Sequence, residues 1–277
     1  MLTSQIRDEI AAKIFHCHQT QQQIPLLTES YPEFELADAY AIQEQVVGRF
    51  AANGDPVKGY KIGLTSKVMQ EMAGTDEPDY SAMPASFFFD ESSPIARAQF
   101  NRPMVEIELA FVIGRPLDGA HATVADVIQA IDYVVPAIEL VDFRVALGPG
   151  MQVIDSIADM AAVGGVVLGG RPRKIHELDL RAVNGSLLIN GEQRESGCSS
   201  AVLGNPLTAV RWLASKMAAM GHHFAPGDVI LSGSFLRAVP VEAGDSIVAR
   251  FDNSFGDVAI GSGFAERNRG HFGHDGL

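Results

Sequence analysis

Apolar residues recur with two different periods along the chain, and the change between them divides it into two parts. In the first 50 residues the spacing is helical, and a second helical segment runs from Ala39 to Phe50 with Asp38 as candidate N-cap and Gly54 as stop. From residue 57 onward, short apolar runs broken by Gly, Pro, Asp and Asn predict β-strands at 57–64, 105–113, 133–141, 163–168, 183–190, 228–233 and 246–251.

Two helices interrupt the predicted strands. One begins at Thr123, with Asp126 three residues later as the acid of a capping box. The other has Asn205 as N-cap and Pro206 in the first helical position, and Gly221 ends it. Strands and helices do not alternate as in a doubly wound parallel sheet. We therefore predict an α+β fold, mostly β, with an N-terminal helical region (1–56), a β-rich catalytic core (57–264) and a disordered polar tail (265–277).

Length and charge narrow the classes of function. The 277 residues suffice for one large core, and a formal net charge of −13 without a basic cluster argues against nucleic acid and against an anionic membrane surface. The first helix carries acids early and no apolar run, so we expect neither a signal peptide nor a membrane span. Only two cysteines, Cys17 and Cys198, occur, which favours a reducing, cytoplasmic location.

The stretch "VEIELAFVIG" at 105–114 reads as a buried strand but carries two acids. Because side chains alternate between the faces of a strand, Glu106 and Glu108 point the same way, about 7 Å apart along its axis. Buried like charges repel, and an unpaired buried carboxylate is costly. The two acids therefore need a cation, unless this face of the sheet is simply exposed to water.

A third acid favours the cation. Glu139 lies within the apolar strand "YVVPAIELVD", and three carboxylates from two strands form an oxygen-rich site suited to Mg²⁺ or Mn²⁺. In "VKGYKIGLTS", Gly59 and Gly63 flank Lys61 on one face and leave room for a ligand or another backbone to approach. Lys61 is thus either an acid–base catalyst in an acidic pocket or an exposed lysine at a strand edge.

Several motifs together resemble one known family. The segments "GYKIGLTSKVMQ", "EPDY", "VEIELAFVIGRPL", "YVVPAIELVDFR" and "VILSGSFLRAVPVEAGD" occur in the order typical of the hydratase and decarboxylase branch of the fumarylacetoacetate hydrolase superfamily. The resemblance extends over about residues 20–260 and implies that superfamily's mixed β-roll core. It also implies that the protein forms a homo-oligomer, a pentamer or a decamer.

The resemblance assigns roles to particular residues. It places Glu106, Glu108 and Glu139 on the metal-binding glutamates, Lys61 on the active-site lysine and Asp79 on an acid beside that lysine. In "SGSFLRAVP", the candidates for substrate contact are Ser234 and Arg237. Arg237 matches an arginine of dioate-using members, although a surface arginine paired with an acid is the alternative.

The implied reaction is the metal-dependent addition of water to a small 2-hydroxydienoate or 2-oxoenoate of the 2-oxohept-3-ene-1,7-dioate type, in the meta-cleavage catabolism of aromatic compounds. The alternatives are hydration of five-carbon 2-hydroxypenta-2,4-dienoate, decarboxylation of 4-oxalocrotonate, carbon–carbon bond hydrolysis, and a binding protein without activity. This chain departs from the pattern at Met160, where relatives tend to carry Asn, and at Ser81, where they carry Gly. Both changes bear on substrate identity more than on metal binding.

Overall fold

The N-terminal region is helical. The computed structural model describes residues 1–91, 93–260 and 264, and it begins with α1 (Ser4–Thr20), α2 (Leu27–Ser30) and α3 (Leu36–Ala52). Helix α3 starts earlier than the sequence predicted. Glu35 is the N-cap, and Asp38 is the third helical residue, whose carboxylate accepts a hydrogen bond from the Glu35 backbone N–H in a capping box. The expected N-cap role of Asp38 is therefore wrong.

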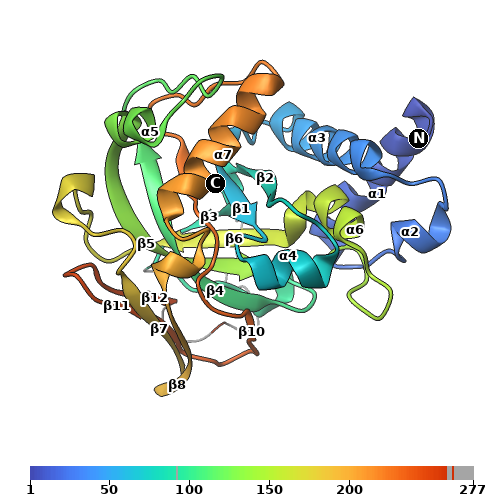
Figure 1. Cartoon of the computed structure of the whole chain (residues 1–277). Coiled ribbons are helices and arrows are strands. Elements are labelled where there is room, and N and C mark those ends of the chain that lie inside the picture. Colours follow the sequence, from blue (N-terminus) through green and yellow to red (C-terminus); the bar gives the residue numbers. More distant parts are fainter. Residues whose placement is uncertain (92, 261–263, 265–277) are drawn as a thin grey trace, which may run out of the picture.

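A large curled sheet forms the centre of the molecule (Figure 1). Its strands follow the order β2-β1-β9-β4-β5-β6-β3, and β10 pairs with β4. The bounds are β1 (Val57–Gly63), β2 (Asp79–Pro84), β3 (Phe88–Phe89), β4 (Met104–Ile113), β5 (Ile131–Val141), β6 (Val163–Leu168), β9 (Val229–Leu231) and β10 (Val239–Pro240). The long antiparallel pair β4–β5 holds the predicted glutamates.

A second sheet has the order β12-β11-β7-β8, and in Figure 1 it lies below the large sheet. Its strands are β7 (Asn184–Ile189), β8 (Glu192–Cys198), β11 (Ile247–Phe251) and β12 (Gly256–Ile260). The remaining helices are α4 (Lys67–Ala73), α5 (Val124–Ala130), α6 (Val153–Ala158) and α7 (Pro206–Ala219). Short 3-10 turns occupy Ala85–Phe87, Arg97–Gln99, Met160–Ala162, Ile175–Glu177 and Ser199–Ala201.

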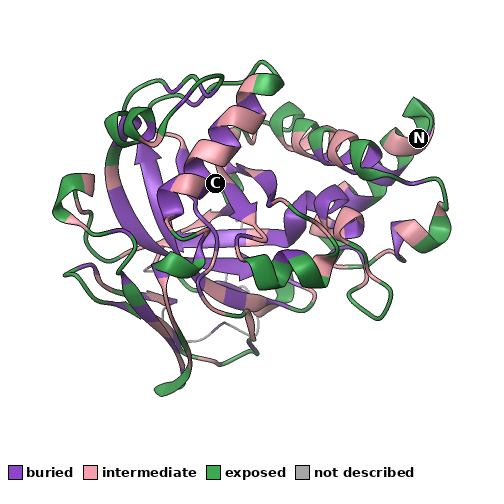
Figure 2. Ribbon diagram, viewed as in Figure 1, coloured by how far each residue is buried: buried purple, intermediate pink, exposed green. Residues whose placement is uncertain are grey.

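The two faces of the large sheet belong to two different cores, and both are buried (Figure 2). From β4, Val105, Ile107 and Leu109 enter the core shared with the second sheet and α7. Ala110 and Val112 enter the core shared with the N-terminal helices. The predicted alternation along β4 is therefore confirmed, and Glu106 and Glu108 occupy the face that the N-terminal helices cover.

Most predicted elements are confirmed. Each predicted strand is present with its ends shifted by two residues or less, and the caps of α5 and α7 are Thr123 and Asn205 as expected. The sequence did not predict β2, β3, β8, β10, β12, α4 or α6. The predicted disordered tail, 265–277, lies outside the described residues. Within the described part of the chain, no helix has the length and apolar character needed to cross a membrane.

Candidate active site

Three carboxylates meet on strands β4 and β5. Glu106 and Glu139 are direct partners in the antiparallel register, and Glu108 lies two residues further along β4 on the same face. One oxygen from each carboxylate lies within 4.8 Å of the others. Among residues 1–91, 93–260 and 264, this is the only group of three or more His, Cys, Asp or Glu side chains with such a geometry.

The cluster lacks the partners that buried charges need. Glu108 and Glu139 are buried, and Glu106 is partly buried. The backbone N–H of Gly233 donates to Glu108 Oε2 over 2.8 Å, but neither oxygen of Glu139 accepts a hydrogen bond from the described residues. Converging carboxylate oxygens without enough donors fit a hard divalent cation, which prefers oxygen ligands.

The pKa values of the glutamates also favour a bound cation. Burial, and then the charge of Glu139, raise the pKa of Glu106 above its usual value. The same two causes, with Glu106 as a further one, raise the pKa of Glu108 well above its usual value. Without a cation the cluster therefore tends to hold protons, and a divalent ion would replace them.

Lys61 of β1 places a cation beside the carboxylates and offsets part of their charge. Its Nζ lies 3.3 Å from Glu139 Oε1 and donates to the backbone carbonyl of Ala161 over 3.0 Å. Burial lowers the pKa of Lys61, but Glu139, Asp79 and the β4 glutamates outweigh it, so the pKa lies above its usual value. The alternative of an exposed lysine at a strand edge is wrong, because Lys61 is only 5% exposed.

Asp79 begins β2 and pairs with Gly63 of β1. Asp79 is buried, and burial raises its pKa. Lys61 lowers this pKa and Glu139 raises it, and the resulting pKa lies above the usual value for an aspartate. A Cβ on Gly63 would lie 2.2 Å from Asp79 Oδ1 and 3.3 Å from Lys61 Nζ. Gly63 therefore makes room for the acid beside the lysine. A Cβ on Gly59 would instead lie 2.2 Å from the carbonyl oxygen of Val229, so that glycine accommodates another backbone.

The carbonyl that accepts from Lys61 was not predicted. It lies in the turn Met160–Ala162, whose residues all have left-handed backbone angles, with φ of 54°, 48° and 56°. Such angles cost non-glycine residues about 1–2 kcal/mol each. The side chain of Met160 is fully buried in the core that includes the N-terminal helices. No side-chain pattern in the sequence signals a backbone carbonyl of this kind.

The two predicted substrate contacts lie in the loop after β9, which also supplies Gly233. The Ser234 hydroxyl donates to the Leu236 carbonyl over 2.9 Å and so stabilises the turn. The Arg237 guanidinium is 84% exposed and forms an ion pair with Glu195 of β8 at 3.1 Å. Arg237 follows Gly233, whose backbone N–H donates to Glu108, by four residues. Its side chain nevertheless lies at the surface, in the ion pair with Glu195.

Comparison with known proteins defines the family. The model of the fumarylacetoacetate hydrolase C-terminal family matches residues 45–262, most of the chain. This protein belongs to the fumarylacetoacetate hydrolase family. Within the family, the chain is 42% identical to 2-oxo-hept-4-ene-1,7-dioate hydratase of Escherichia coli over 88% of this chain and 93% of that protein. It is 40% identical to 2-keto-4-pentenoate hydratase of Paraburkholderia xenovorans over 88% and 90%.

A solved structure of the same family agrees with the fold. The 4-oxalocrotonate decarboxylase of Pseudomonas putida G7, complexed with magnesium and adipate, superposes with a TM-score of 0.89 at 33% identity. The superposition covers 94% of this chain and 98% of that one, so it includes N-terminal helices as well as the core. The family resemblance found in the sequence motifs is thus confirmed, and so is the α+β class with its β-roll core. Helices contribute at least as many residues as strands, however, so the fold is not mostly β.

Proposed function

We propose that this protein is a divalent-metal-dependent hydratase that adds water to a 2-hydroxydienoate or its 2-oxo tautomer, in the meta-cleavage catabolism of aromatic compounds. The observation that carries the proposal is the buried convergence of Glu106, Glu108 and Glu139 beside Lys61. Support comes from two hydratases that are 42% and 40% identical to this chain and are matched over 93% and 90% of their own length.

Glu106, Glu108 and Glu139 would hold Mg²⁺ or Mn²⁺. When bound there, such an ion supplies Lewis-acid stabilisation to the negative charge that develops on the C2 oxygen of the substrate. The protein's own part is to bind and to move protons. Because such ions prefer about six oxygen ligands, the three carboxylates would leave positions for the C1 carboxylate and the C2 oxygen of the substrate, and binding there would orient its distal carbons.

Lys61 is the proposed proton carrier at those distal carbons, and Asp79 orients it. The side chain is enclosed by the site carboxylates and by the Ala161 carbonyl, so bulk water has little access to its ammonium group. The C2 hydroxyl would give up its proton while Lys61 donates one to C5, so the dienol would become the conjugated enone without gaining a proton overall. Water would then add with its hydroxyl at C4 and a proton at C3, and the product would be a 2-oxo-4-hydroxy acid. The raised pKa of Lys61 favours the proton-donor form as the resting state.

Decarboxylation of 4-oxalocrotonate is the second candidate. The structural similarity to a 4-oxalocrotonate decarboxylase favours it, as does 33% identity to the enzyme of that name from Pseudomonas sp. CF600. The same charge stabilisation at C2 serves both reactions, so the metal cluster and Lys61 cannot separate them.

Product mass separates the two reactions. The metal-loaded protein would be incubated with five-carbon and seven-carbon 2-hydroxydienoates and with 4-oxalocrotonate, and followed by loss of ultraviolet absorbance and by mass spectrometry. Gain of one water from a dienoate supports the hydratase, and loss of carbon dioxide from 4-oxalocrotonate as the faster reaction supports the decarboxylase. No conversion of any of the three would overturn both proposals.

The proposed homo-oligomer of five or ten chains is tested separately. Sedimentation velocity at several protein concentrations would give the mass of the assembly. A monomer at all concentrations would contradict this part of the proposal.

A further inference from the structure

The turn that meets Lys61 is held in an unfavourable conformation. Met160, Ala161 and Ala162 all have positive φ, none of them is glycine, and all three are buried. A backbone in this region persists only where its surroundings fix it, and such strain is concentrated at functional sites. Among the residues that the structure describes, Lys61 is the side chain that donates a hydrogen bond to the Ala161 carbonyl, over 3.0 Å.

One buried ion pair encloses this turn from both ends. Arg144 Nε donates to Asp159 Oδ1 over 2.7 Å, and its Nη2 donates to the backbone carbonyl of Asp159 over 2.8 Å, just before the turn. Its Nη1 donates over 2.9 Å to the carbonyl of Val163, just after the turn. The planar guanidinium thus fixes the separation of the two residues that flank the turn, which a single ammonium could not do.

Backbone hydrogen bonds fix the carboxylate of Asp159 as well. Its Oδ2 accepts from the backbone N–H of Arg144 over 2.6 Å and from that of Val145 over 3.0 Å. Both charged side chains are almost fully buried, at 3% and 0% exposure. A buried ion pair is a poor means of adding stability, because apolar residues of similar volume do as well or better. Its retention is better explained by the geometry that it imposes.

We propose that Arg144 and Asp159 form a positioning pair for the proton-transfer lysine: they hold the left-handed turn so that the Ala161 carbonyl fixes the Nζ of Lys61 beside Glu139. This inference rests on the proposed role of Lys61. Within the described part of the chain, no hydrogen bond or ion pair joins Arg144 or Asp159 to Lys61, so the pair acts on the lysine through the turn. The pair is also tied to the N-terminal region, because the N–H of Ile24 donates to the Arg144 carbonyl over 2.9 Å.

The first test replaces Arg144. In Arg144→Met the turn loses its fork of donors, and we expect kcat to fall roughly 10- to 100-fold, as for a misplacement of about 1 Å at a catalytic group. KM and the Mg²⁺ dissociation constant should stay within about threefold, because the glutamates are untouched. Arg144→Lys keeps the charge without the fork, so its kcat should lie between those of Arg144→Met and the wild type.

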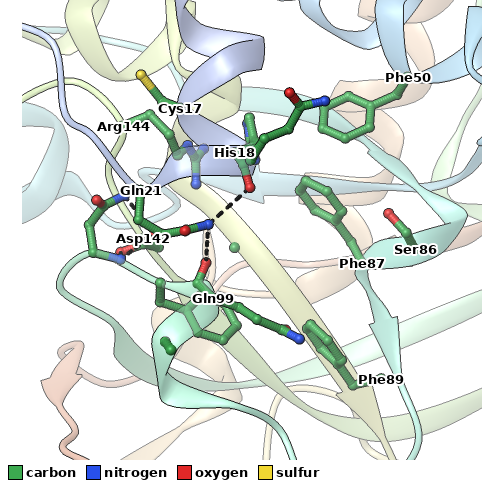
Figure 3. Close-up of a pocket in the computed structure, with 15 residues that line it drawn as sticks. Cys17, His18, Gln21, Phe50, Ser86, Phe87, Phe89, Gln99, Asp142 and Arg144 are labelled. Atoms are coloured by element: carbon green, nitrogen blue, oxygen red, sulfur yellow. Dashed lines mark hydrogen bonds between the residues drawn. The ribbon is translucent and has the colours of Figure 1, made fainter. Parts of the chain in front are cut away.

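A cavity gives access for chemical rescue. Arg144 lines a cavity of about 510 Å³ between the end of α1 and the segment 86–101, together with His18, Phe87 and Phe100 (Figure 3). Methylguanidinium is small enough to enter from this side. We expect it to restore part of the kcat of Arg144→Met in a saturable way, and to leave the wild type and Lys61→Ala unchanged.

A matched control is Asp38→Asn. Asp38 is also fully buried, accepts backbone hydrogen bonds and lies near an arginine, Arg7. Its partners within the described part of the chain are Leu2, Glu35 and Arg7, so it contacts neither the turn nor Lys61 through a hydrogen bond or ion pair. This variant should lose thermal stability while its kcat stays within about twofold of the wild type. Asp159→Asn is the second test variant. It keeps the size of the Asp159 side chain, but it removes the charge and replaces one of the two acceptor oxygens with an NH2 donor. It should therefore repeat the kcat loss.

The experiments distinguish a failure of the proposed positioning pair from a failure of the proposed function. Wild-type kcat in a folded Arg144→Met or Asp159→Asn protein would overturn the inference. So would an increase in KM and in the Mg²⁺ dissociation constant by as large a factor as the fall in kcat. Failure of both variants to fold would also overturn it, because the pair would then be structural. A wild-type protein without hydratase or decarboxylase activity would instead refute the proposed function itself.

Discussion

Glu106 and Glu139 face each other as direct partners across the antiparallel strands β4 and β5. Cross-strand like charges are normally destabilising, and here the pair is joined by Glu108, one alternation further along β4. Lys61 of β1, which β9 separates from β4 in the sheet, offsets part of this charge. The sheet therefore carries more negative charge at one point than its own residues neutralise, which is the arrangement expected of a metal centre.

Metal affinity should depend on pH. Glu106 has a pKa raised to about 8 from a usual value of 4.5, so below about pH 8 the metal-free site holds a proton that the ion must displace. We expect Mg²⁺ affinity to rise at least roughly tenfold per pH unit up to about 8 and then to level off. Isothermal titration calorimetry in buffers of different ionisation enthalpy measures both the affinity and the protons released.

The stability of the metal-free protein should change in the opposite direction. Because the folded pKa of Glu106 lies above the unfolded one, its stabilising contribution is complete below about pH 4.5 and is lost as pH rises through about 8. The rise in Tm on adding Mg²⁺ should therefore be larger at high pH. Glu106→Gln removes this proton, so an unchanged pH slope in that variant would refute the assignment.

Lys61→Ala tests the proton carrier. We expect kcat to fall by about 10²–10⁴-fold, the usual contribution of a general acid or base, while Mg²⁺ binding remains, since removal of a cation leaves all three glutamates in place. Lys58→Ala, on the opposite face of β1 and exposed, is the matched control. A Lys61→Ala protein with more than about a tenth of the wild-type rate would make the lysine structural.

Two glycines on the same face of β1 should respond differently to alanine. In Gly63→Ala the new methyl group meets the Asp79 carboxylate at 2.2 Å, so it should displace that acid and lower kcat by up to roughly 10²-fold. In Gly59→Ala it meets the backbone of Val229, so it should mainly lower Tm. Steady-state rates and thermal melts of both variants check this contrast, and the reverse result would contradict it.

Substrate length is tested at Arg237. If its guanidinium leaves Glu195 to bind the distal carboxylate of a seven-carbon dioate, Arg237→Ala should raise KM for that substrate roughly tenfold to a hundredfold, as for loss of a charged hydrogen bond. KM for the five-carbon monoacid should not change. Glu195→Ala is the control, because it frees the arginine without removing it. Equal effects of Arg237→Ala on both substrates would assign Arg237 to the surface ion pair alone.

The sequence was informative where side-chain periodicity determines the structure. Alternation along a strand was enough to place Glu106 and Glu108 on one face, and a lone acid among apolar neighbours was enough to add Glu139. The room left by Gly63 beside Lys61 was also anticipated. These inferences depend on local spacing, which the fold preserves.

The sequence was silent where the structure depends on backbone geometry or on contacts across the chain. "DMAAV" contains no glycine and resembles a helical segment, so neither the left-handed turn nor the Ala161 carbonyl could be anticipated. Strand β2, "DYSAMP", is short, and its polar residues Asp79 and Ser81 are buried along with most of its apolar ones, so polarity along the sequence does not reveal it. Arg144 reads as an isolated basic residue, and only the fold brings it to Asp159, fifteen positions away.

Titration of the metal-stripped protein with Mg²⁺ shows whether the reaction needs a metal centre at the three glutamates, with calorimetric binding and turnover measured on the same samples. We expect one ion bound per chain, turnover that rises in proportion to occupancy from a negligible level, and loss of both in Glu108→Gln, whose fold and Tm stay near those of the metal-free wild type. Full turnover in the thoroughly stripped protein, or undiminished binding in Glu108→Gln, would contradict the claim that the three glutamates form a metal centre on which the reaction depends.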